Sequence, residues 1–292
     1  MSRKMMLALA CALASVAMPG MAWAETVMGP NTVTLPDADA KITLPKGYAW
    51  AGKDEAKKAL EKEGSSTEGI QGFIVPVEHD KNEWLVLVRW DDVGYVKDDD
   101  AAKLNADEIL KSYKDGTTEQ NEARKEKGIP PIYVGGWAEK PRYEKAKHQV
   151  VWAIQGKDEE AATAPVVTVN YNTRILGRRG VLSLNLVTDP DKVDINKSKV
   201  AALLDKTDFN NGAQYKDYVA GKDKASGFGI AGLILGGGAV AAAAKLGLLG
   251  GLWKWGIGII LVMKKFIIVL VAAAAAAINK FLKRGKKEDG SV

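Results

Sequence analysis

The sequence predicts an α+β domain with a mostly antiparallel sheet and inserted helices, followed by a C-terminal transmembrane helix and an amphipathic membrane helix. Three observations predict it. Residues 25–221 contain β-branched and aromatic runs in groups, with helical patterns inserted among them. The first 24 residues have the pattern of an export signal. The chain from Phe228 to Leu282 is predominantly apolar.

The export signal has a charged start, an apolar stretch and a cleavage site. Arg3 and Lys4 precede the apolar residues 5–18, and Ala22-Trp23-Ala24 forms a small-x-small site. We therefore expect residues 1–24 to be a signal peptide, with an uncleaved N-terminal anchor as the alternative. The single cysteine, Cys11, lies inside this segment, so the mature chain offers no disulfide, thiol nucleophile or cysteine metal ligand.

The basic net charge of +5 does not indicate nucleic-acid binding. Residues 25–221 contain 28 Lys and Arg against 33 Asp and Glu, a net charge of −5. The excess positive charge lies in residues 222–292, beside the apolar segments, where basic residues usually report topology and lipid contact. We expect no nucleic-acid partner.

Within the 25–221 domain, local patterns predict helices and strands in a mixed order. The predicted helices are Lys53–Glu63, Ala101–Lys114, Thr118–Lys127 and Asn196–Asp208. The predicted strands are Gly72–Val77, Glu83–Trp90, Pro131–Trp137, His148–Ile154, Pro165–Asn172 and Val181–Thr188.

An acidic loop at 91–100 is the densest group of charged side chains. Its carboxylates are of the type that binds a hard cation, although their spacing does not match an EF-hand. The favoured interpretation is a turn at Asp91–Gly94, followed by Asp99 or Asp100 capping the next helix. The candidate interaction residues here are Asp91, Asp92, Tyr95, Lys97, Asp98 and Asp99.

A second candidate stretch, 170–180, contains three arginines and two glycines. Arginine donates in a planar fork that suits a carboxylate or phosphate. The favoured interpretation is instead a glycine-turned hairpin with surface arginines. The candidate residues are Asn170, Tyr171, Arg174 and Arg178. We also expect an ion pair between Arg174 or Arg178 and Asp98 or Asp99.

No catalytic, metal or cofactor motif is found. The two histidines, His79 and His148, lack the spacing of a zinc site, and Ser183 is not on a Gly-x-Ser-x-Gly turn. No phosphate-binding loop or dinucleotide fingerprint is present. We therefore expect no cofactor and no enzymatic activity.

Five motifs occur together in this order in one bacterial family. They are Leu44-Pro45-x-Gly47-Tyr48, Gly94-Tyr95-Val96-Lys97-Asp98-Asp99, Asn121-Glu122-x-Arg124, Gly136-Trp137-x3-Pro141-x-Tyr143, and Asn170-Tyr171-Asn172-Thr173-Arg174-x-Leu176-Gly177-Arg178-x-Gly180. On these residues the chain resembles the domain of unknown function 2167 family, described as predicted membrane-anchored proteins. The resemblance implies an envelope location and a C-terminal anchor, but no activity and no functional residues. A looser similarity of predicted topology is to PsbP-like extrinsic domains.

The C-terminal part predicts attachment to the bacterial inner membrane. Residues 222–252 are expected to hold a linker and one crossing helix, Phe228–Gly250, whose roughly 23 residues suit a hydrocarbon core of about 30 Å. Residues 253–292 are expected to form a basic amphipathic or second hydrophobic segment and a tail that contacts anionic lipid. The alternative is a two-helix membrane hairpin. The spacing Gly232-x3-Gly236 allows a homo-oligomer through the membrane helix.

The sequence thus predicts a membrane-anchored envelope protein with its soluble domain in the periplasm. The favoured function is a non-catalytic binding or scaffolding module with an envelope protein as its partner. The alternative is an envelope enzyme that uses the 91–100 loop, with a divalent cation as an optional participant.

Overall fold

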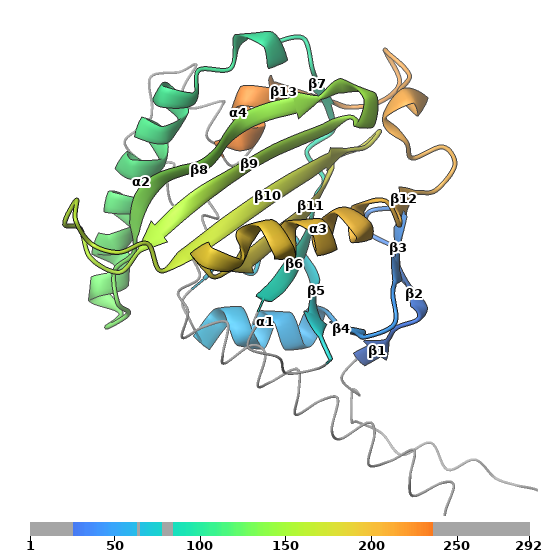
Figure 1. Ribbon diagram of the computed structural model, residues 1–292. Helices are drawn as coiled ribbons and strands as arrows, with labels where there is room; N and C mark the ends of the chain where they lie inside the picture. The colour runs from blue at the N-terminus through green and yellow to red at the C-terminus, as the bar shows by residue number, and fades with distance from the viewer. Residues whose placement is uncertain (1–25, 63–64, 78–83, 236–292) are drawn as a thin grey trace, which may run out of the picture.

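The computed structural model describes residues 26–62, 65–77 and 84–235. Within these residues an eight-stranded antiparallel sheet forms the middle layer, in the order β1-β4-β5-β6-β11-β10-β9-β8 (Figure 1). The predicted α+β class with a mostly antiparallel sheet is confirmed. The strands are β1 (Thr26–Met28), β4 (Tyr48–Ala51), β5 (Ile70–Pro76), β6 (Trp84–Asp91), β8 (Tyr133–Glu144), β9 (Gln149–Lys157), β10 (Thr168–Leu176) and β11 (Val181–Thr188).

One face of the sheet, which we call face A, bears Trp84, Leu184 and Tyr171. It is covered by helix α3 and by a three-stranded sheet in the order β12-β3-β2. Their side chains join those of face A in one buried apolar cluster. Each large apolar side chain buried there contributes about 1.5–3 kcal/mol. The covering elements are α3 (Val193–Leu204), β2 (Asn31–Leu35), β3 (Ala40–Leu44) and β12 (Thr207–Phe209).

The opposite face, face B, bears Leu87, Asn185 and Trp152 and carries two separate apolar clusters. Helix α1 (Lys53–Lys62) covers the first, over β4, β5 and β6. Helix α2 (Ala106–Glu126) covers the second, over β8 and β9. Each helix contributes apolar residues at helical spacing, so face B is packed near both ends of the sheet.

Residues 228–235, the start of the predicted crossing helix, lie inside the folded domain. Strand β13 (Ala225–Gly229) pairs in parallel with β7 (Tyr95–Lys97), and the short helix α4 (Ile230–Ile234) follows it. Ile230 and Leu233 are buried in the cluster beneath α2, and the Tyr113 hydroxyl donates a 2.7 Å hydrogen bond to the Ile234 carbonyl. The folded structure therefore continues past residue 221.

Three predictions about helix ends were wrong. The predicted helices 101–114 and 118–127 form one helix, α2, whose cap is Asn105; its side chain accepts from the Asp107 and Glu108 amides at 3.1 and 3.3 Å. Asp100 does not cap α2, because its carboxylate accepts from the backbone amides of Ile230 and Ala231 in α4. The predicted last helix ends at Leu204, and residues 207–209 form β12 instead.

Short 3-10 turns connect several of these elements. They are η1 (Ala101–Lys103), η2 (Lys145–Lys147), η3 (Pro190–Lys192) and η4 (Tyr215–Asp217).

In the part of the chain that the structure describes, every helix is too short or too polar to cross a bilayer. The predicted signal peptide 1–24, the predicted crossing from residue 236 onward and the predicted tail 253–292 lie outside the described residues.

Candidate functional site

Four tyrosines from separate parts of the chain meet at one end of the domain. Tyr95 of β7 stacks on Tyr215 and Tyr218, with ring centroids 4.5 and 3.9 Å apart. Tyr143 lies near the end of β8 and faces the same group through His148. Figure 1 shows the tip of the β8–β9 hairpin, near Tyr143, beside the coil that follows β12 and contains Tyr215 and Tyr218. We call Tyr95, Tyr143, Tyr215 and Tyr218, with Asp98 and His148, the tyrosine cluster.

A chain of polar contacts joins the loop at 91–100 to the β8–β9 turn. The Tyr143 hydroxyl donates to Asp98 Oδ2 at 2.8 Å and lies 3.2 Å from His148 Nδ1. The His148 ring lies 4.4 Å from the Tyr215 ring, between centroids. His148 has a φ of 48°, a left-handed conformation that is uncommon for a residue with a side chain. Its two ring contacts help to hold the turn in this conformation.

Both inner phenols are kept protonated. Burial raises the pKa of Tyr143, and its hydrogen bond to Asp98 raises it further. Burial also raises the pKa of Tyr215, as does its hydrogen bond with Tyr95. The Tyr215 hydroxyl donates to the Val96 carbonyl at 2.9 Å. Neutral phenols with raised pKa values are hydrogen-bond donors rather than bases at neutral pH, so the arrangement is suited to binding.

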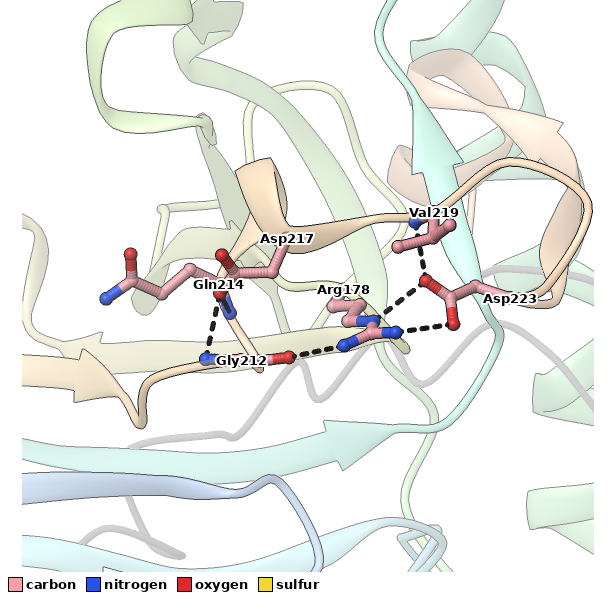
Figure 2. Close-up of polar contacts among 6 residues, drawn as sticks. All are labelled: Arg178, Gly212, Gln214, Asp217, Val219 and Asp223. Carbon is pink, nitrogen blue, oxygen red and sulfur yellow. Dashed lines mark hydrogen bonds and ion pairs between the residues drawn. The ribbon is translucent and has the colours of Figure 1, made fainter.

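Arg178 fixes the coil that carries Tyr215 and Tyr218. Figure 2 shows its guanidinium donating to both carboxylate oxygens of Asp223, at 2.8 Å each, and to the Gly212 carbonyl at 3.0 Å. Asp223 Oδ2 also accepts from the Val219 amide at 2.7 Å. The hydrogen bonds from Arg178 hold the pKa of Asp223 below its usual value. One side chain thereby joins both ends of the 212–223 coil.

The start of the same coil is held by a local cap. Asp217 Oδ2 accepts from the backbone amides of Gly212 and Gln214, at 3.0 Å each (Figure 2). Gln214 and Asp217 form a capping box around η4, which contains Tyr215. The tyrosines are therefore presented on a coil that its own polar groups keep in shape.

We expect Arg178→Gln and Asp223→Asn each to loosen this coil without unfolding the domain. Either change removes the two-pronged ion pair and weakens the hold on the Val219 amide. Hydrogen exchange should then be faster at Val219 in both variants. The double variant should exchange no faster than either single one, because the same contact is lost in each case. Additive acceleration would show that the two side chains act separately.

The predicted ion pair between the two candidate stretches was wrong. Arg178 binds Asp223 instead, and the Arg174 guanidinium lies over the Trp152 ring, 5.3 Å from its centroid. Asp98 accepts from Tyr143. The stretches do meet through the backbone, where the Gly94 amide donates to the Arg179 carbonyl at 2.8 Å.

The remaining candidate residues are spread over several environments. Asp91 ends β6, with the Ser183 hydroxyl 3.5 Å from its Oδ2, while Lys97 and Asp99 are exposed. Asn170 and Tyr171 are buried inside β10 and point to faces B and A respectively, so they belong to the sheet rather than to a loop.

Asp92 is exposed and lines an open hollow of about 590 Å³ with the charged residues Asp37, Lys53, Lys57 and Glu68. Lys53 and Asp37 form an ion pair across it at 3.0 Å. Among the described residues, no group of three or more histidine, cysteine, aspartate or glutamate side chains is arranged to hold a metal ion.

The sequence pattern missed most residues of the tyrosine cluster and its support. Tyr215, Tyr218 and Asp223 lie in a stretch for which no structure was predicted. The spacing of Gln214 and Asp217 was the available signal, because it matches a capping box. His148 was expected only to open a strand, and it instead ends the turn before β9.

A comparison with protein-family models matches residues 27–275 to a family described as "Protein of unknown function (DUF2167)". The chain belongs to this family. The resemblance drawn from the five motifs is thus confirmed at the family level. The DUF2167 description assigns no activity. No curated protein matches the chain.

Solved structures give distant similarities. Cyanobacterial PsbP from Synechocystis sp. PCC 6803 is 13% identical, with a TM-score of 0.38, over 68% of this chain and 99% of that one. The Saccharomyces cerevisiae Ran-binding protein Mog1p is 8% identical, with a TM-score of 0.31, over 63% of this chain and 96% of that one.

Proposed function

We propose that this chain is a non-catalytic binding or scaffolding module of the bacterial cell envelope, and that it docks a protein partner on the tyrosine cluster. The observation that carries the proposal is the partly exposed stack of Tyr95 and Tyr218 beside Val219, a large apolar side chain that is 39% exposed. Tyrosine is enriched among residues that dominate binding energy at protein interfaces, because one ring offers both apolar area and a hydroxyl.

The support beneath the stack favours tight binding. Arg178, Asp217 and Asp223 hold the 212–223 coil, so a partner does not have to order it. Immobilising a flexible side chain or loop at an interface costs about 0.5–1.5 kcal/mol for each rotamer-rich side chain. A surface that is already held in place avoids much of this cost.

The partner is tested by crosslinking the native protein in its membranes and identifying the captured chains. The proposal expects one reproducible protein partner. Capture of no reproducible protein, together with turnover of an envelope substrate by the purified chain, would contradict it.

We propose that the domain lies in the periplasm and is attached to the inner membrane by the apolar residues that follow the described part of the chain. The export-signal pattern and the basic residues around the C-terminal apolar stretches support this location. External protease added to spheroplasts should then digest the domain. A phosphatase fused after Val292 should be inactive if the tail is cytoplasmic, whereas activity would favour the two-helix hairpin.

For the alternative enzyme, the acidic loop would have to gather its carboxylates around a cation. In the structure, the Asp98 carboxylate accepts a hydrogen bond from Tyr143, and the Asp100 carboxylate accepts one from the start of α4. We therefore expect calcium to cause no saturable rise in the melting temperature of the full-length chain. A bound cation at 100 times its dissociation constant would add about 2.7 kcal/mol. A saturable rise that Asp98→Asn abolishes would support the enzyme instead.

A further inference from the structure

A row of polar side chains crosses face B between its two apolar clusters. Arg89 of β6 lies directly opposite Ser183 of β11, and Ser183 lies directly opposite Arg174 of β10. We call these three residues the arginine row. Neighbouring strands lie about 4.8 Å apart, so the two arginines start roughly 10 Å apart, with a hydroxyl between them.

Neither arginine of the row forms an ion pair with a carboxylate in the part of the chain that the structure describes. Arg89 donates to the backbone carbonyls of Ser66, at 2.6 Å, and of Glu68. Burial and the charge of Arg174 together lower the pKa of Arg89 to about 10, against the opposing effects of Asp91 and Glu68.

Among the described residues, the Arg174 guanidinium lies over the face of the Trp152 ring. The Arg174 side chain is partly exposed. Its planar set of N–H donors is therefore available to a ligand.

Two amides beside the row are buried with unmet hydrogen-bonding capacity. Asn185 Nδ2 donates to Asn170 Oδ1 at 3.3 Å, but Asn170 Nδ2 and Asn185 Oδ1 have no partner. Asn170 is 2% exposed and Asn185 is 7% exposed. A buried polar group without a partner costs about 1–3 kcal/mol, so such a pair calls for an explanation. The unpartnered donor belongs to Asn170 and the unpartnered acceptor to Asn185, and an amide has the C=O and the N–H that would satisfy them.

We propose that the arginine row and these two asparagines bind a small ligand that carries a carboxylate and a neighbouring amide. The carboxylate is held by the Arg174 guanidinium, since a planar fork matches its two oxygens. The ligand amide pairs with Asn170 Nδ2 and Asn185 Oδ1. This site lies on face B, apart from the tyrosine cluster, and does not depend on the proposed protein partner.

The test titrates the full-length chain, purified in mild detergent, with N-acetylglycine, acetate and inorganic phosphate, and follows binding by calorimetry. N-acetylglycine is expected to bind saturably, and acetate about tenfold more weakly because it lacks the amide. Arg174→Gln should weaken N-acetylglycine binding by about tenfold or more. Arg174→Lys should recover part of the loss, because it restores the charge without the fork.

Arg179→Gln is the matched control, since Arg179 is exposed in the neighbouring turn and should leave binding unchanged. An absence of saturable binding, or an equal loss in the Arg179 and Arg174 variants, would overturn the proposal. Phosphate binding as tightly as N-acetylglycine, with the same dependence on Arg174, would overturn the assignment of the amide.

Discussion

Replacing Tyr218 with alanine is expected to weaken binding of the protein partner by about 30-fold, the loss that corresponds to an interface residue contributing about 2 kcal/mol. Tyr218 lies on the outer side of the stack, where its ring packs on Tyr95 at 3.9 Å between centroids. Truncation removes an aromatic surface that Arg178 and Asp223 hold in place. The affinity of the partner captured by crosslinking is measured on the immobilised full-length chain.

The matched control is Ile195→Ala. Ile195 is an apolar residue that is 54% exposed on α3, the helix that covers the other side of the sheet. We expect less than a twofold change in affinity for this variant, because isolated exposed apolar residues are common on protein surfaces. Equal affinities of the Tyr218 and Ile195 variants would remove the tyrosine cluster from the interface.

Replacing Asp100 with alanine is expected to lower the free energy of unfolding by about 2 kcal/mol, as for a strong helix cap. The carboxylate accepts from the Ile230 amide at 2.8 Å and from the Ala231 amide at 3.2 Å. Without it, two amides at the start of α4 lose their partner, and the contacts of α4 with α2 weaken. Urea unfolding followed by tryptophan fluorescence gives the change in stability.

Asp99→Ala is the control for this change. Asp99 is the exposed neighbour of Asp100, so its loss should alter stability by less than about 0.5 kcal/mol. Hydrogen exchange at Ile230 and Ala231 should accelerate in the Asp100 variant alone. Unchanged exchange at these amides would mean that α4 is held by its apolar side chains and not by the cap.

Local pattern predicted the elements whose signals are long and regular. The alternation and β-branched content of 181–188 predicted β11 at its observed bounds, and the helical spacing of Ile109 and Tyr113 predicted the buried side of α2. The short strands β1 to β4 have three to five residues each and were not predicted, because such runs are too brief for a periodic signal.

The candidate site was less accessible to sequence reasoning, because its contacts join distant parts of the chain. Asp100 sits just before a helix, so a local cap was the simplest interpretation, yet its partners are 130 and 131 residues away. Arg178 was expected to pair with an aspartate of the acidic loop. It binds Asp223 instead, which lies in a coil that had no predicted structure. These choices depend on tertiary contacts that no local pattern contains.

The central claim, that the tyrosine cluster is the surface that binds a protein, is tested most directly by site-specific photocrosslinking. A photoreactive amino acid is placed at position 218 in one full-length variant and at position 195 in another, and both are irradiated in native membranes. The account predicts one dominant crosslinked protein from position 218 and little or none from position 195. The same protein captured equally from both positions, or from position 195 alone, would contradict it.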